Sequence, residues 1–89
     1  MEITELLRFA KEQGASDLHL SAGEPALVRV DGEIRKMDSP PLKKEDIHTL
    51  LYDIFNDRQK LIFEENHEID FSIEFKGIAR FRVSAYLQD

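Results

Sequence analysis

Cysteine is absent from this chain of 89 residues, and glycine occurs only four times. Without a thiol, neither a disulfide framework nor a thiolate metal site is possible. The glycines also stand too far apart for a phosphate-binding loop, which needs two closely spaced glycines followed by a lysine. The sequence therefore lacks the usual element that holds ATP. The glycines are Gly14, Gly23, Gly32 and Gly77.

Long apolar segments are missing as well. No run approaches the ~20 residues that a membrane-spanning helix needs. Near the start of the chain, Glu2, Glu5 and Glu12 interrupt the apolar residues, whereas a signal peptide has a continuous apolar region there. We therefore expect a cytoplasmic chain that does not insert directly into a membrane.

Basic residues are outnumbered, with 12 lysines and arginines against 18 aspartates and glutamates and a formal net charge of −6. Contacts from basic side chains to phosphates dominate the affinity of proteins for nucleic acids. Anionic lipid surfaces attract clustered basic residues for the same reason. An acidic chain without a basic run therefore predicts neither a nucleic-acid partner nor an anionic membrane surface.

The length of the chain allows one domain at most.

The strongest pattern runs from residue 68 to residue 87, where apolar and polar residues alternate in two halves. Such alternation is typical of strands that bury one face. The apolar positions are odd-numbered in both halves, so the numbers of paired residues must add up to an even number. A turn of Lys76, Gly77 and Ile78 satisfies this rule, and its glycine can supply the positive φ that such turns need. This register puts Phe75 opposite Ala79, Ile73 opposite Phe81, Phe71 opposite Val83, Glu74 opposite Arg80 and Ser72 opposite Arg82.

Three helices and three further strands are expected before this hairpin. Apolar residues recur with helical spacing in the first two helices, and Asn56 followed by Gln59 resembles a capping box that starts the third. The first expected helix carries Ile3, Leu6, Leu7 and Ala10 and stops at Gly14. The other two are expected over residues 44–55 and from 57 to about 65, and the expected strands are 17–21, 26–30 and 33–37, with a tight turn at Asp31-Gly32.

Helices and antiparallel hairpins are thus segregated along the chain, which favours an α+β fold over alternating βαβ units. We predict a mostly antiparallel five-stranded sheet with helices packed on one face, an architecture that PAS-like domains share. The predicted core combines the odd-numbered residues of the hairpin with Leu18, Leu20, Val28, Val30, Leu50, Leu51 and Ile54.

Catalytic constellations are not evident in the sequence. His19, His48 and His67 fall on three different expected elements without the spacing of metal ligands, so a structural or surface role is favoured for each. Asp17 and His19 share one strand face, where such a pair is usually solvated. The sequence therefore predicts no catalytic residue and no metal site, and a self-contained enzyme is not expected.

Arg80 and Arg82 project from one face of the last expected strand. One interpretation is that they form cross-strand ion pairs with Glu74 and Asp70. The other is that they form a fork for a phosphate or carboxylate that a partner supplies, because guanidinium groups suit bidentate anion recognition. The alternation alone favours the ion pairs.

Three segments carry a family resemblance. They read GASDLHLSAGEP at residues 14–25, VRVDG at 28–32 and ARFRV at 79–83, and the opening ITELL and the segment 48–57 are similar too. In this order and spacing they resemble the N-terminal domain of the type IV pilus retraction ATPases, the PilT-like, twitching-motility branch of the secretion ATPase superfamily. The resemblance covers essentially the whole chain.

The resemblance implies a bacterial, cytoplasmic homohexamer at the inner-membrane pilus base. Each subunit would have a PAS-like N-terminal domain and a RecA-like C-terminal motor domain that holds ATP and Mg and drives pilus disassembly. Residues 1–89 are then expected to be a single N-terminal domain of a longer chain whose motor domain is absent, with no cofactor and no ATPase activity of its own. Its implied partners are that motor domain, the neighbouring subunits and, indirectly, the machinery of the pilus base.

The resemblance also implies a role for arginines, because in the family arginines of the N-terminal domain approach the nucleotide in the motor domain. Arg82, with Arg80 beside it, matches this role by its place in the last strand before the expected linker, and Arg29 is a second candidate. The alternative is a free-standing PAS-like module that binds a small ligand or a partner. A reading frame that continues beyond Asp89 into a phosphate-binding loop would favour the motor, whereas a co-purifying ligand would favour the module.

Overall fold

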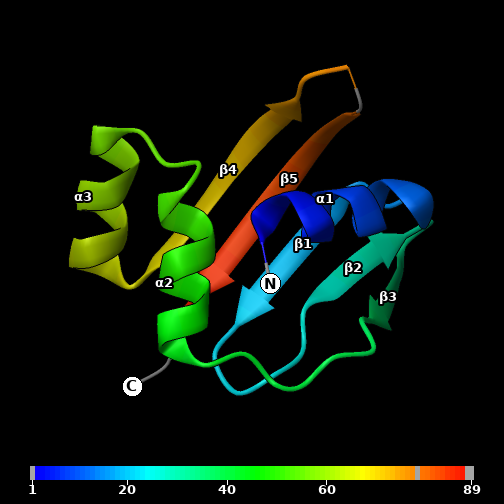
Figure 1. Cartoon of the computed structure of the whole chain (residues 1–89), viewed down its shortest axis with the longest axis horizontal. Coiled ribbons are helices and arrows are strands. Elements are labelled where there is room, and N and C mark those ends of the chain that lie inside the picture. Colours follow the sequence, from blue (N-terminus) through cyan, green and yellow to red (C-terminus); the bar gives the residue numbers. More distant parts are fainter. Residues whose placement is uncertain (1, 78, 88–89) are drawn as a thin grey trace.

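The structure is a computed structural model that describes residues 2–77 and 79–87. Within these ranges, three helices and five strands follow one another in the predicted order (Figure 1). None of the helices in these ranges combines the length and the apolar character of a membrane-spanning segment. The elements are α1 (Ile3–Glu12), β1 (Asp17–Ser21), β2 (Leu27–Val30), β3 (Glu33–Lys36), α2 (Lys44–Tyr52), α3 (Asp57–Asn66), β4 (Glu68–Phe75) and β5 (Ala79–Tyr86).

All five strands form one sheet in the order β3-β2-β1-β5-β4. Neighbouring strands pair antiparallel except at the centre, where β1 and β5 run parallel. The predicted α+β fold with a mostly antiparallel sheet is therefore confirmed. The parallel pair joins the first strand to the last and puts Leu18 opposite Val83 and Asp17 opposite Arg82.

The β4–β5 hairpin has the predicted register. Phe75 lies opposite Ala79, and the pairing continues without a break to Glu68 opposite Tyr86. Gly77 has a φ of 73°, in the left-handed region that glycine enters without a steric penalty. Ile78, the third residue of the predicted turn, lies outside the described residues. The sequence rule of odd-numbered apolar positions thus fixes this register correctly.

The Asp31-Gly32 turn between β2 and β3 is also as predicted. Both residues have positive φ, 50° for Asp31 and 81° for Gly32, as a tight turn that matches the twist of its strands requires. The strands themselves are shorter than predicted, because β2 begins at Leu27 and β3 ends at Lys36. Ala26 still contributes to the ladder through its carbonyl oxygen, which accepts from the N–H of Met37.

The helix ends follow the local chemistry of the sequence. α1 ends just before Gly14, whose φ is 72°. The predicted capping box of α3 is present, because the Asn56 side chain accepts from the N–H of Gln59 and the Gln59 side chain accepts from the N–H of Asn56. The predicted span of α2 was too long, since the helix ends at Tyr52. Its last turn is followed by a bend that redirects the chain into α3.

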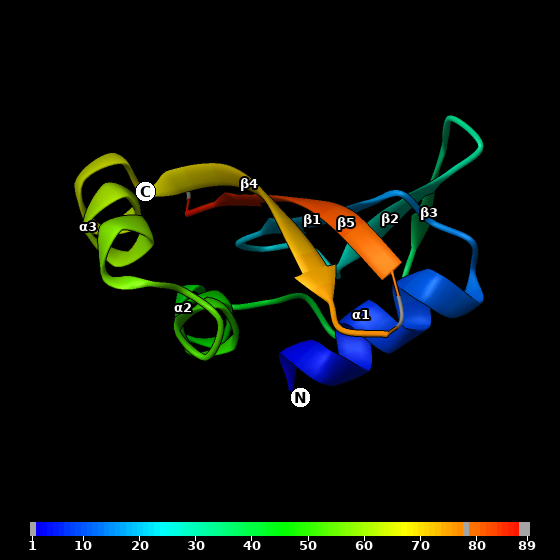
Figure 2. The ribbon, with the colours of Figure 1, turned by 90° about the horizontal axis from the view of Figure 1, so that it is seen from above.

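A single core lies between the sheet and the helices. α1 and α2 lie against the same face of the sheet, as expected, whereas α3 lies beside the edge strand β4 (Figure 2). α3 enters the core through Phe63, whose ring packs edge-on against Phe55 with centroids 5.6 Å apart. Removing apolar surface from water in this way is the main favourable contribution to folding. The predicted core residues Leu18, Leu20, Val28, Val30, Leu50 and Leu51 are all buried.

The prediction was wrong for several outer members of the core. On β4 only Ile69 is buried, and Phe71, Ile73 and Phe75 are half-buried, whereas Phe81, Val83 and Ala85 of β5 are buried. The reason is that β4 is the edge strand, so one of its two sides has no neighbouring strand. Leu87 and Ile54 are half-buried as well and pack against the core.

Candidate functional site

All three arginines singled out by the sequence lie on the face of the sheet opposite α1 and α2, here called the open face. Arg29 is on β2, and Arg80 and Arg82 are on β5, and all three are exposed. Their strand neighbours Val28 and Val83 point into the core, so alternation turns the arginines outward. The open face is therefore where the candidate site lies.

Asp17 connects two of these arginines. It is the pairing partner of Arg29 on one side and of Arg82 on the other. Residues that pair across strands share a face, so Arg29, Asp17 and Arg82 form one row, here called the arginine row. With strands about 4.8 Å apart, the two arginine Cα atoms are about 10 Å apart. The row alternates positive, negative and positive charge.

The backbone holds the ends of this row in place. The N–H of Ser16 donates to the carbonyl oxygen of Arg29 at 3.1 Å, and the N–H of Arg82 donates to the carbonyl oxygen of Ser16 at 3.0 Å. The hydroxyl of Ser16 also donates to Oδ1 of Asp17 at 2.7 Å. A single residue thus orders both arginine-bearing strands and the carboxylate between them.

Arg82 forms a bidentate ion pair with Asp70. Its Nε donates to Oδ1 at 3.0 Å and its Nη2 donates to Oδ2 at 2.6 Å. These hydrogen bonds from Arg82 lower the pKa of Asp70, and the bonds to Asp70 raise the pKa of Arg82, with a smaller contribution from Asp17. Both side chains remain about half exposed or more, 62% for Arg82 and 49% for Asp70, so water screens the pair.

Arg80 stands apart from the arginine row. It lies opposite Glu74, as the register predicts, towards the β4–β5 turn. In the described part of the chain, however, no ion pair joins Arg80 to Glu74. The two residues are therefore paired across the strands as expected, but their side chains do not form the expected ion pair. The structure therefore brings Arg29 and Arg82 together around Asp17 and leaves Arg80 beyond them.

A second row of the open face lies beside the arginine row and contains His19, Ser84 and Asp70 on β1, β5 and β4. Nε2 of His19 is buried without a hydrogen-bond partner among the described residues. Ser84 is only 7% exposed, although its neighbours Arg82 and Tyr86 on the same face are exposed. The centre of the open face is therefore more enclosed than its margins.

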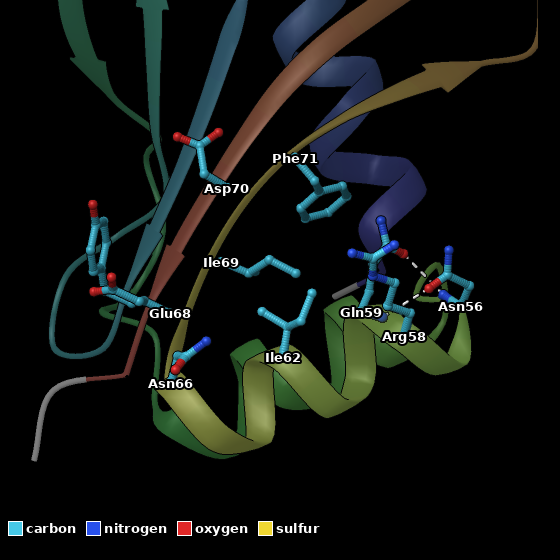
Figure 3. A pocket seen from close by; sticks show the side chains of 10 residues that line it. Asn56, Arg58, Gln59, Ile62, Asn66, Glu68, Ile69, Asp70 and Phe71 are labelled. Atoms are coloured by element: carbon cyan, nitrogen blue, oxygen red, sulfur yellow. Dashed lines mark hydrogen bonds between the residues drawn. The ribbon is translucent and has the colours of Figure 1, made fainter.

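A groove of about 480 Å³ lies between α3 and β4 (Figure 3). Ile62, Ile69 and Phe71 give it an apolar side, and Figure 3 shows these three side chains lying near one another between the helix and the strand. Its polar lining comes from Asn56, Arg58, Gln59, Asn66, Glu68, Asp70 and Tyr86. Sequence reasoning missed this groove, because it depends on where α3 comes to rest against β4.

The histidines do not form a common site. His19 is on β1, His48 is on α2 and His67 follows α3. Among the described residues, no group of three potential metal ligands is close enough to hold an ion.

Asp53 and Asp57 are exposed near the α2–α3 junction, where Asp57 lies in the first turn of α3.

Sequence reasoning also missed a cluster that joins α2 to α3. Nε2 of His48 is 2.9 Å from Oε1 of Glu64, and the hydroxyl of Tyr52 donates to the same oxygen. The hydrogen bond to Glu64 raises the pKa of Tyr52 to about 12. The four-residue spacing of His48 and Tyr52, whose rings stack at 3.8 Å, was the available signal. The cluster is exposed and fastens the two helices together.

Comparison with known proteins identifies relatives whose similarity extends over nearly the whole chain. No protein-family model matches it. The chain is 57% identical over 89 residues to the type IV pilus retraction ATPase PilT of Pseudomonas aeruginosa and 41% identical over 88 residues to the type IV pilus ATPase PilU of the same organism. It is also 34% identical over 84 residues to a twitching motility protein of Neisseria gonorrhoeae. These matches cover 94–100% of the chain but only 22–26% of the relatives.

Solved structures lead to the same group. A crystal structure of the pilus retraction motor PilT with bound ADP matches 92% of the chain with a TM-score of 0.73 and 42% identity. The ATPase DotB of Legionella pneumophila matches 94% of the chain with a TM-score of 0.71, and at 24% identity it supports the fold alone. In both cases the chain spans about a quarter of the solved structure. Over its whole length the chain is thus similar to a part of the type IV pilus ATPases PilT and PilU, and it spans about a quarter of their length.

Proposed function

We propose that this chain is the non-catalytic N-terminal domain of a cytoplasmic, hexameric pilus-retraction ATPase. In this proposal it packs against its own motor domain and neighbouring subunits, and its arginines approach the nucleotide held by the motor. The support is the 57% identity to PilT over the whole chain together with the bound ADP in the solved PilT structure. The match covers 26% of PilT, so most of the length of PilT lies outside it and is long enough for a separate motor domain.

The observation that carries the proposal is the arginine row. Two exposed arginines project from the open face in one row, and guanidinium is the side-chain group best suited to phosphate oxygens. An exposed sheet face can be covered by another domain without any change in the fold. Charge that develops on a phosphoryl group in the transition state is stabilised by such preorganised donors. Arg82 is the first choice and Arg29, across Asp17, is the second.

The test compares one substitution in two proteins. In the 89-residue chain, Arg82→Ala removes a screened surface pair, so the Tm should fall by less than about 5 °C. In the longer ATPase, the same change should slow hydrolysis by ~10-fold or more, because a donor to the developing charge is lost. Arg82→Lys should restore the rate only in part, since a point charge lacks the fork geometry.

Lys36→Ala is a matched control, because Lys36 is an exposed cation on the same face, paired with Leu27 outside the arginine row. It should leave both Tm and hydrolysis close to the parent values. If Arg82→Ala unfolds the short chain while the longer protein keeps its rate, Arg82 is structural and the proposal fails. Saturable ATP turnover by the 89-residue chain would contradict its non-catalytic assignment.

The groove between α3 and β4 favours a second candidate, a free-standing module that binds a small ligand. Its volume of about 480 Å³ falls in the range of small-molecule pockets, and it combines an apolar side with several amides. A compound that co-purifies with the 89-residue chain and is lost in Ile62→Glu would support this candidate. A gene that continues past codon 89 into a phosphate-binding loop would favour the motor instead.

A further inference from the structure

The guanidinium of Arg82 is already bound to a carboxylate in the structure, although its proposed role requires it to bind phosphate. Nε and Nη2, which together form one edge of the guanidinium, both donate to the carboxylate of Asp70. This edge is one of those that can bind two oxygens of a phosphate side by side. An anion that approaches it must therefore first displace Asp70.

The choice of Asp70 is specific, because a second carboxylate stands at the same offset. Arg82 lies opposite Ser72, and Asp70 and Glu74 are the residues two places before and two places after Ser72 on β4. All share the open face, since they alternate with the apolar residues of the strand. In the described part of the chain, Asp70 is the only residue that bonds to the guanidinium of Arg82. The twist of the sheet makes the two diagonals unequal, which gives the preference a physical basis.

The ion pair between Arg82 and Asp70 also lies where another anion can replace the carboxylate. Both side chains are about half exposed or more, so water competes for each hydrogen bond. On the opposite side of Arg82, Asp17 is held by Ser16 and raises the pKa of Arg82 without bonding to it. A phosphate group carries more negative charge and more acceptor oxygens than a carboxylate, and can therefore replace Asp70 once it is delivered to the open face.

We propose that Asp70 is a positioning residue that acts as an exchangeable carboxylate latch, holding Arg82 until a phosphate group replaces it. This inference rests on the phosphate-directed role proposed above for Arg82. The latch keeps the guanidinium extended along the open face and preformed for bidentate binding. It also weakens the binding of stray anions, since each must compete with a tethered carboxylate.

The first experiment uses the 89-residue chain and inorganic pyrophosphate as the probe. The NMR signal of the Arg82 Nε–H group is followed during titration in the parent, Asp70→Asn and Glu74→Gln proteins at one ionic strength. Both variants remove one negative charge from the open face at the same offset from Arg82. We expect Asp70→Asn to tighten pyrophosphate binding about two- to five-fold more than Glu74→Gln does, as the loss of a weak exposed pair allows.

Equal effects of the two variants would overturn the latch, because general repulsion would then account for both. Failure of pyrophosphate to move the Arg82 signal in Asp70→Asn would overturn it as well, since the released guanidinium would not be taking phosphate. The double variant Asp70→Asn/Arg82→Ala tests whether the tighter binding of pyrophosphate acts through Arg82. Any tightening due to release of the latch should vanish in it, and tightening that persists would contradict the proposal.

The second experiment uses the longer ATPase and separates this inference from the function on which it rests. Asp70→Asn should lower the KM for ATP about two- to five-fold relative to Glu74→Gln, with kcat changed less than two-fold. A parent-like rate in Arg82→Ala would defeat the proposed function itself. A slow Arg82→Ala protein combined with identical KM values in Asp70→Asn and Glu74→Gln would defeat the latch alone.

Discussion

The two faces of the sheet are built from alternate residues of the same strands, yet they have opposite properties. On the inner face, Leu18, Val28 and Val83 are fully buried in the core. Their neighbours Asp17, Arg29 and Arg82 form the arginine row of the open face. The comparison shows that stability and recognition can be divided between positions only one residue apart, so their effects should separate under mutation.

The largest effect should come from the inner face at Phe81, which is 1% exposed. Phe81→Ala removes most of a buried ring and leaves a cavity, so we expect the free energy of unfolding to fall by about 3–5 kcal/mol. Urea denaturation with an unchanged m-value would measure this loss. Arg82→Ala, one residue along, is the matched control on the open face. Similar losses in the two variants would break the division between the faces.

A smaller effect is expected at Phe71, on the inner side of the edge strand. Its ring packs edge-on against Phe55 at 5.4 Å, but the side chain is only half-buried. Phe71→Ala should therefore cost about 2 kcal/mol, less than Phe81→Ala, because less apolar area returns to water. The same urea series measures it. A loss as large as that of Phe81→Ala would mean that β4 is covered as fully as β5.

The smallest effect concerns the carboxylate of the open face. Arg82 lowers the pKa of Asp70, so this group contributes stability above the ordinary pKa of an aspartate. That contribution is lost as the pH falls through the lowered pKa of the folded state. Arg82→Ala should move the pKa of Asp70 back up towards its ordinary range, which an NMR titration of the carboxyl carbon measures. An unchanged titration of Asp70 would show that the pair does not persist in solution.

Much of the fold follows from local chemistry and could be predicted. The odd-numbered apolar positions of residues 68–87 set the hairpin register because a shift by one residue would turn every apolar side chain to water. The positive φ of Asp31 and Gly32 and the capping box of Asn56 were likewise readable, since turns and caps depend on neighbours in sequence.

The candidate site was predictable only in part. Arg29, Arg80 and Arg82 could be placed on polar strand faces, and Asp70 could be named as an ion-pair partner of the arginines. The end of α2 and the half-burial of Phe71 could not be predicted, because they depend on which strand forms the edge and where the helices lie.

The sequence by itself therefore determined the order of the strands, the Asp31-Gly32 turn, the hairpin register and the outward direction of the arginines, because periodicity and turn chemistry act over a few residues. Only the tertiary structure decided that β1 pairs parallel with β5, which sets Asp17 between Arg29 and Arg82. It also decided that Arg82 takes Asp70 rather than Glu74, and that α3 and β4 enclose a groove. These features join residues that are distant in the chain. The local sequence pattern is compatible with several such arrangements, and side-chain packing and sheet twist select one of them.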